Sequence, residues 1–188
     1  MLKKLALMTK PFEFYFDFVS PYSFLAHKEI RKIEIQEGIK IKYNPILLGG
    51  LHNLHGIKAP AFIPAKAKHM IKDCKLVAEK NNIRFKFNSY FPIRSLNLMR
   101  GVLVAEEDNI KSYYIDNIFN SIWQDGLNMN DENIKEKVLK NLSVNPKTFL
   151  LRSTSSIIKD SLKKKTSDAY QKGIFGAPTF VANNKIFW

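Results

Sequence analysis

The sequence predicts an α/β fold in which strands near both ends of the chain enclose a block of helices. Three observations lead to this prediction. Residues 12–19 and 39–44 alternate with the period of a β-strand, and residues 21–37 between them have helical spacing. Residues 61–172 repeat the helical spacing over a much longer stretch. Residues 177–188 then return to short runs that are typical of strands.

The first unit is a strand, a helix and a second strand. The first strand carries a phenylalanine at every second position, at Phe12, Phe14, Phe16 and Phe18. The helix ends at Gly38, because glycine adopts the left-handed conformation that terminates many helices. The second strand is interrupted at Pro45, since proline cannot donate a hydrogen bond to a neighbouring strand. Two strands joined by a helix form a βαβ unit, so we expect them to be parallel.

The end of the chain predicts a hairpin. The pair Asn183-Asn184 separates two short apolar runs, and asparagine tolerates the backbone conformations of tight hairpin turns. We assign residues 11–47 and 173–188 to one domain and residues 48–172 to a helical insertion. A helix that covers the sheet would be expected next. The printed sequence stops at Trp188, so we expect this final covering helix to be missing.

Composition and charge argue against nucleic-acid and membrane partners. Hydrophobic residues make up 45% of the chain and charged residues 25%, which is ordinary for a globular protein. The net charge of +13 attracts anions, but only residues 163–165 form a basic run, so we expect no nucleic-acid partner. No apolar run reaches the roughly 18–20 residues that span a bilayer, and residues 1–10 do not make a signal peptide. We therefore expect a cytoplasmic protein without a membrane partner, starting at Met1 or Met8.

The single cysteine, Cys74, excludes an internal disulfide, a Cys-x-x-Cys dithiol and a zinc site built on cysteines. It lies on the apolar stripe of its helix, so we expect a buried thiol. We place His52 and His55 in a loop without an acidic partner, and His27 at the exposed face or edge of the first helix. The sequence therefore predicts no metal site.

The junction between the first strand and the helix reads Ser20-Pro21-Tyr22-Ser23. Serine is a preferred N-cap residue and proline is favoured at the first helical position, so Ser20 and Pro21 suit a helix start. The same helix end presents free N–H groups and a partial positive charge, which favour an anion such as a thiolate. The Ser20 hydroxyl can donate a hydrogen bond to that thiolate and lower the pKa of the thiol. The two roles are compatible, with the sulfur supplied by a bound ligand.

The segment Ala177-Pro178 would complete this site. A proline that opens a strand beside a helix end can take the cis form, and Ala177 could then offer its N–H and C=O groups to an extended peptide ligand. The alternative is an ordinary turn proline at the start of a strand. Tyr22 either stacks near the ligand or packs on the helical insertion.

Five stretches carry a family resemblance: FYFDFVSPYSFLA (14–26), AFIPAKAKHM (61–70), FPIRSLNLMR (91–100), FNSIWQDGLN (119–128) and GIFGAPTF (173–180). Together they resemble the 2-hydroxychromene-2-carboxylate isomerases and the kappa-class glutathione transferases, whose fold is similar to that of DsbA-type oxidoreductases. The resemblance covers nearly the whole chain. It implies a thioredoxin-like, DsbA-like fold with a large all-helical insertion, in a homodimer.

The resemblance implies glutathione as the bound thiol, with Ser20 at its sulfur and Pro21 and Tyr22 beside it. Ala177 and Pro178 would match the cis-proline segment that pairs with the glutathione backbone. The implied activity is a glutathione-dependent isomerase, in which the thiolate adds reversibly to a small aromatic substrate that can be anionic. A kappa-class transferase, whose thiolate stays attached to the electrophile, is one alternative. A shortened, non-catalytic member with weak or no glutathione binding is the other.

The sequence departs from the family pattern at three places. Ile57 and Arg94 stand where the family often has asparagine. The family commonly continues with a glycine-(polar)-aspartate-arginine stretch that holds the γ-glutamyl end of glutathione, and this stretch would follow Trp188. Lys66 and Arg94 are either surface charges or attract a substrate carboxylate.

Overall fold

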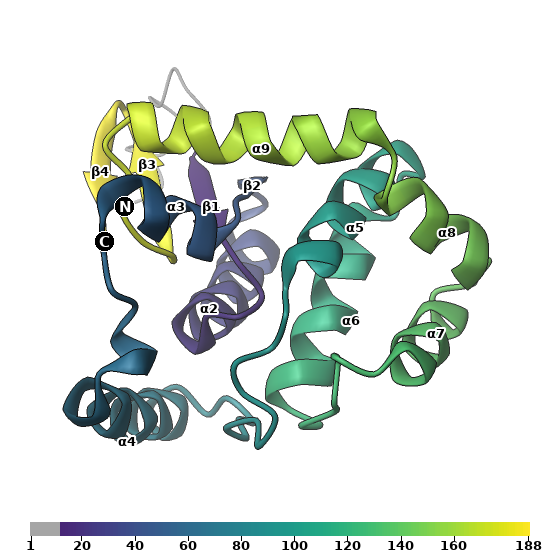
Figure 1. Cartoon of the computed structure of the whole chain (residues 1–188). Coiled ribbons are helices and arrows are strands. Elements are labelled where there is room, and N and C mark those ends of the chain that lie inside the picture. The colour runs from purple at the N-terminus through teal and green to yellow at the C-terminus, as the bar shows by residue number, and fades with distance from the viewer. Residues whose placement is uncertain (1–11) are drawn as a thin grey trace.

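A computed structural model describes residues 12–188. Figure 1 shows a small sheet between helix α2 (Pro21–Glu37) and helix α9 (Ser156–Gln171), with a lobe of further helices to one side. This is the α/β arrangement that the sequence predicts. The expectations that concern Pro11 and the position of the starting methionine lie outside the described residues.

The sheet of the described residues has four strands in the order β2-β1-β3-β4: β1 (Glu13–Phe16), β2 (Lys42–Pro45), β3 (Thr179–Ala182) and β4 (Lys185–Phe187). The predicted parallel pairing of β1 with β2 is confirmed, while β3 is antiparallel to both β1 and β4. The predicted hairpin turn is also confirmed. Asn183 and Asn184 have φ angles of 48° and 62°, in the left-handed region that suits a type I′ turn.

The predicted bounds of the second strand are wrong. The sequence predicts strand at residues 39–44 with an interruption at Pro45, whereas β2 begins at Lys42 and includes Pro45. Strand β2 lies at the edge of the sheet, where one side of its backbone needs no hydrogen-bonding neighbour. A proline without an N–H group is tolerated at such a position.

Helix α2 has the predicted bounds, with Ser20 as its N-cap and Gly38 at its end with a φ angle of 64°. Its apolar side packs on one face of the sheet, where the rings of Phe14 and Phe16 are fully buried. The other face packs against α3 and α9 through a second buried cluster that consists of Tyr15, Ile46, Leu51, Ala169 and Ile174.

The predicted helical block is confirmed. Between β2 and α9 it contains α3 (Leu48–His55), the short 3₁₀ helix η1 (Pro60–Phe62), α4 (Pro64–Lys80), α5 (Leu96–Glu107), α6 (Lys111–Trp123), α7 (Glu132–Asn141) and α8 (Pro146–Ser153). Helix α9 contacts β2 and α3 as well as α5 and α8. The division into residues 11–47 with 173–188 and an insertion of residues 48–172 therefore stays a prediction.

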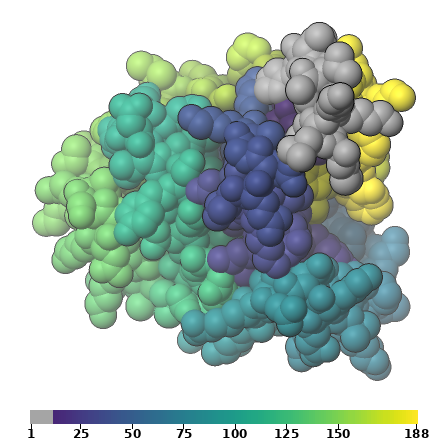
Figure 2. Space-filling model, turned by 180° about the vertical axis from the view of Figure 1, so that it is seen from behind, coloured from purple at the N-terminus to yellow at the C-terminus, as the bar shows by residue number. Residues whose placement is uncertain are grey.

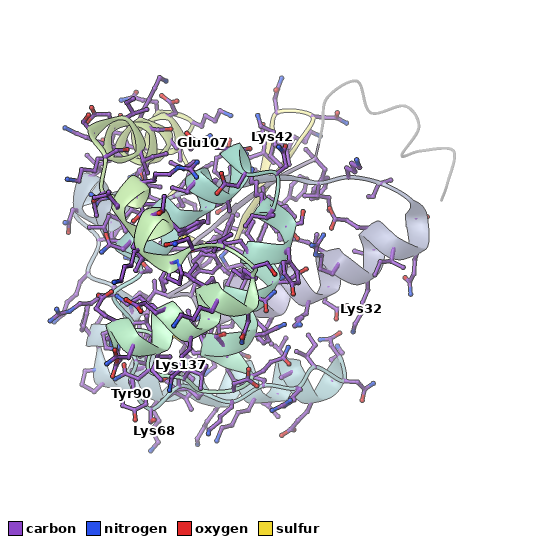
Figure 3. All side chains as sticks on the ribbon, turned by 90° about the vertical axis from the view of Figure 1, so that its right-hand side faces the viewer. Lys32, Lys42, Lys68, Tyr90, Glu107 and Lys137 are labelled. Carbon is purple, nitrogen blue, oxygen red and sulfur yellow. The ribbon has the colours of Figure 1, made fainter. Side chains whose placement is uncertain are left out.

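The basic residues are dispersed over the surface, as the sequence suggests. Figure 3 shows Lys32, Lys42, Lys68 and Lys137, which belong to four different elements. Figure 2 shows the opposite side from Figure 1, where part of α2 is exposed between the helical lobe and the β3–β4 hairpin. No helix within residues 12–188 is long and apolar enough to cross a membrane.

Candidate functional site

The candidate site begins where β1 leads into α2. Ser20 has an extended backbone, with φ −85° and ψ 116°, and its Oγ accepts a 3.1 Å hydrogen bond from the backbone N–H of Ser23. Pro21 occupies the first helical position. The predicted cap is therefore present. Pro21 has no N–H group and the N–H of Ser23 donates to Ser20, so among the described residues the N–H of Tyr22 is the one left open at this helix end.

The hydroxyl of Ser20 also reaches the far end of the chain. Its Oγ donates a 2.9 Å hydrogen bond to the backbone carbonyl of Ala177. The Ala177–Pro178 peptide bond is cis, as the sequence suggests, and β3 begins at the next residue. The structure thus brings together Ser20, Pro21, Ala177 and Pro178. Among the described residues the N–H group of Ala177 has no hydrogen-bond partner.

Tyr22 connects this helix end to α4. Its hydroxyl donates a 2.7 Å hydrogen bond to Oδ2 of Asp73. Burial and this carboxylate raise the pKa of Tyr22, so the phenol stays protonated. The neighbouring Cys74 is buried, as predicted, and burial raises the pKa of its thiol to about 12. A thiol in that state is a poor nucleophile near neutral pH, so this chain does not supply a reactive sulfur.

Asp17, for which no role was predicted, lies next to the Ser20 loop. Its fully buried carboxylate accepts hydrogen bonds from the backbone N–H groups of Val19 at 3.0 Å and Leu48 at 2.8 Å. Its backbone carbonyl accepts a bond from the N–H of Ser20. Burial raises the pKa of Asp17, against the effect of these donors and of the hydroxyl of Ser95. Asp17 thus joins the Ser20 loop to the start of α3.

His27 was expected at an exposed face or edge of α2, and this expectation is wrong because its side chain is fully buried. Its Nδ1 lies 2.9 Å from the hydroxyl of Tyr43 and its Nε2 lies 2.7 Å from Oδ1 of Asp116. Burial lowers the pKa of His27. Burial acts to raise the pKa of Asp116, but hydrogen bonds from His27 and Arg31 outweigh it and lower that pKa to about 2.

The pair His52 and His55 lies on α3, so the expected loop position is wrong. Nε2 of His55 is 2.9 Å from the carbonyl of Ile174, and its ring packs against Tyr170. These contacts attach α3 to the segment that leads to Ala177. Within residues 12–188 no group of three or more histidine, cysteine or acidic side chains is arranged to hold a metal ion.

A pocket of about 130 Å³ opens on another side of α2, away from Ser20. Its lining includes the cationic side chains of Arg31, Lys42 and Lys111. Each of these cations has a carboxylate partner of its own: Asp116 and Glu34 for Arg31, Glu13 for Lys42, and Glu106 for Lys111. The pocket therefore has little positive charge left for a ligand.

Several known proteins are similar to this chain in sequence. A family model described as "DSBA-like thioredoxin domain" matches residues 12–188. A 2-hydroxychromene-2-carboxylate isomerase of Sphingobium xenophagum is 27% identical over 183 residues, which cover 96% of this chain and 93% of the relative. The glutathione S-transferase kappa 1 of Caenorhabditis elegans is 27% identical over 175 residues, which cover 88% of this chain and 77% of the relative.

Solved structures show the same fold. A 2-hydroxychromene-2-carboxylate isomerase superposes with a TM-score of 0.87 at 23% identity, over 95% of this chain and 88% of that one. The cytosolic disulfide reductase DsbM of Pseudomonas aeruginosa, solved with GSH, gives a TM-score of 0.69 at 14% identity, over 95% of this chain and 88% of that one. The thioredoxin-like, DsbA-like fold expected from the sequence is confirmed, as is the resemblance to the isomerases and kappa-class transferases.

Proposed function

Because the chain belongs to the DSBA-like thioredoxin domain family, we propose that it is a glutathione-dependent isomerase of the 2-hydroxychromene-2-carboxylate isomerase type. The observation that carries the proposal is the contact between Ser20 and Ala177 at the tip of α2. This is a helix end suited to a sulfur anion, in a chain whose own cysteine is buried at Cys74. The sulfur must then come from a ligand.

The residues present fit a thiol-containing peptide. The N–H group of Ala177 has no partner among the described residues, so it is free to donate to a peptide carbonyl. Within residues 12–188 its C=O accepts from Ser20 alone, and it can accept from a peptide N–H instead. Such pairing would hold the ligand as an extended strand beside Pro178, with its thiol at the tip of α2 between Pro21 and Tyr22.

Bound glutathione would supply a thiolate that adds reversibly to the substrate and leaves after a bond has rotated. In this proposal Ser20 turns its hydroxyl proton from the carbonyl of Ala177 to the sulfur. The hydrogen bond and the positive end of the α2 dipole stabilise the anion, which lowers the pKa of the bound thiol. The thiol proton leaves to solvent, and Ser20 remains protonated throughout.

A kappa-class glutathione transferase is the second candidate, since the chain is 27% identical to such an enzyme. The same residues would stabilise the same thiolate, but the sulfur would stay bonded to an electrophilic product. We further propose a small aromatic, anionic substrate, a cytoplasmic location and a homodimer. The net charge of +13 favours an anionic substrate.

Calorimetric titration with glutathione tests the proposal, and S-methylglutathione serves as a matched ligand without a free thiol. We expect both to bind, and only glutathione to support isomerisation of 2-hydroxychromene-2-carboxylate. A product that retains glutathione would favour the transferase. A dissociation constant above roughly 10 mM, equivalent to less than about 3 kcal/mol of binding, would rule out a glutathione-dependent enzyme and leave the non-catalytic alternative.

A further inference from the structure

The hydroxyl of Ser23 lacks a partner. Ser23 is fully buried, and its Oγ makes no hydrogen bond to any residue that the structure describes. Buried polar groups in proteins are nearly always paired. Other buried hydroxyls on helices of this chain donate to a carbonyl about one turn back: Ser153 to Leu150 at 2.7 Å and Thr166 to Leu162 at 2.9 Å. Ser23 makes no such hydrogen bond, so its hydroxyl is available for another partner.

The position of Ser23 suggests a partner. It is the third residue of α2, and its backbone N–H already donates to Oγ of Ser20. Side chains on a helix lean toward its N-terminal end, so the Ser23 hydroxyl lies on the side of the Ser20 cap. A serine hydroxyl can donate one hydrogen bond and accept two. Oγ of Ser20 donates to Ala177 and accepts from the Ser23 N–H, which leaves one acceptor position open.

We propose that Ser23 is a positioning residue whose hydroxyl donates to Oγ of Ser20 when Ser20 donates to the sulfur of a bound thiol. This inference rests on the proposed function. The resulting chain runs from Ser23 to Ser20 to the thiolate, and each hydrogen bond polarises the next. Ser23 is fully buried, so in this proposal it does not contact the ligand itself. It acts by fixing the direction of the Ser20 proton and by strengthening Ser20 as a donor.

The relay explains why a hydroxyl occupies this buried position. Without ligand the Ser23 hydroxyl has no partner within residues 12–188, so an alanine would be tolerated equally well or better at the same place. The hydroxyl becomes useful only when Ser20 turns away from Ala177. Its benefit is therefore expected in the liganded protein, as a lower thiol pKa, and not in the unliganded protein as a higher melting temperature.

The variant Ser23→Ala tests this in the full chain. The pKa of bound glutathione is measured from the ultraviolet absorbance of the thiolate, and the melting temperature is measured without ligand. We expect the thiol pKa to rise by about 0.5 to 1 unit. The melting temperature should stay the same or rise, and the affinity for S-methylglutathione should change by less than about threefold. The control Ser153→Ala removes a buried, paired hydroxyl, so it should lower the melting temperature without changing the thiol pKa.

Two results would overturn the inference. An unchanged thiol pKa in Ser23→Ala would exclude the relay while leaving the proposed function intact. A lower melting temperature of unliganded Ser23→Ala, or a failure to fold, would mean that the hydroxyl is already used in the free protein. If the unmodified protein does not bind glutathione, the proposed function fails first and the inference fails with it.

Discussion

The hydroxyl of Ser20 donates a 2.9 Å hydrogen bond to the carbonyl of Ala177, although 157 positions separate the two residues. Sheet topology explains this contact. Strands β1 and β3 are antiparallel neighbours, with Tyr15 opposite Thr179, so the end of β1 lies beside the start of β3. The helix that follows β1 and the cis peptide that precedes β3 therefore meet where these two inner strands end and begin. The candidate site is a consequence of this pairing.

The first prediction concerns Ser20→Ala. Loss of the cap should lower the free energy of unfolding by about 0.5–2 kcal/mol. Loss of the donor should raise the pKa of bound glutathione by about one unit or more. Denaturant unfolding and a thiolate absorbance titration measure the two effects. Ser155→Ala is the matched control, because Ser155 caps α9 through the N–H of Ile158. It should reduce stability and leave the thiol pKa unchanged. If bound glutathione had the same thiol pKa in Ser20→Ala as in the unmodified protein, the role of the hydroxyl would be contradicted.

The second prediction concerns Tyr22→Phe. This change keeps the ring and removes the 2.7 Å hydrogen bond to Asp73, which attaches α2 to α4. We expect a loss of about 0.5–1.5 kcal/mol in the free energy of unfolding. Hydrogen exchange should quicken in α4 more than in α6, since α6 is attached elsewhere. Tyr113→Phe is the control because Tyr113 is exposed. Exchange that quickens equally in α4 and α6 of Tyr22→Phe would contradict a local attachment.

The elements of the fold follow from local patterns in the sequence. The alternating phenylalanines, Gly38 and the Asn183-Asn184 turn each act on their immediate neighbours, so their effects can be predicted without knowledge of the rest of the chain. The placement of Ser20 beside Ala177 was proposed from a helix start and a proline that opens a strand, and the family resemblance supported it, because nothing local in either segment specifies its partner. The bounds of β2 were missed because the role of Pro45 depends on whether its strand lies at an edge.

The buried polar residues could not be predicted for a related reason. Asp17 accepts from Leu48, 31 positions away, and His27 contacts Asp116, 89 positions away. An isolated aspartate at a strand end and a histidine within a helix have many possible environments. Only the packing of α2 against the sheet and α6 decides that His27 is buried. A charged residue between two phenylalanines was the one available signal for Asp17.

The third prediction is a dependence of stability on pH through His27. Burial lowers the pKa of His27 in the folded protein, so the unfolded chain binds a proton there first, near pH 6.5. The stability contributed by neutral His27 is present above pH 6.5. It is lost as the pH falls from there toward the lowered pKa, with a slope of at most about 1.4 kcal/mol per pH unit. Urea unfolding at a series of pH values measures this slope.

The matched variants are His27→Gln and His69→Gln. The first should reduce the slope and also lower stability at pH 7 by about 1–3 kcal/mol, because Tyr43 and Asp116 lose their buried partner. His69 is exposed on α4, so its replacement should preserve the slope. A residual slope should remain in His27→Gln, since burial also lowers the pKa of His52. An identical slope in all three proteins would show that His27 does not control the acid sensitivity.

The fourth prediction compares two glycines that closely approach an aromatic side chain. A Cβ atom at Gly101 would overlap the hydroxyl of Tyr114, which is buried and donates to the carbonyl of Leu98 at 3.0 Å. A Cβ atom at Gly176 would lie 2.7 Å from Nε1 of Trp188. The crowding is tighter at Gly101, and the indole of Trp188 is 76% exposed and can move away, whereas the buried Tyr114 cannot.

We therefore expect Gly101→Ala to lower the free energy of unfolding by about 1–3 kcal/mol, even after the gain of about 1 kcal/mol from replacing glycine within a helix. Gly176 is itself buried, but the exposed indole of Trp188 can give way, so Gly176→Ala should cost less, about 0.5 kcal/mol. It should still alter tryptophan fluorescence, because Trp188 shifts while Trp123 stays buried. Chemical unfolding and emission spectra measure the two effects. Equal losses of stability in the two variants would contradict the view that a neighbour's freedom to move sets the cost of each added methyl group.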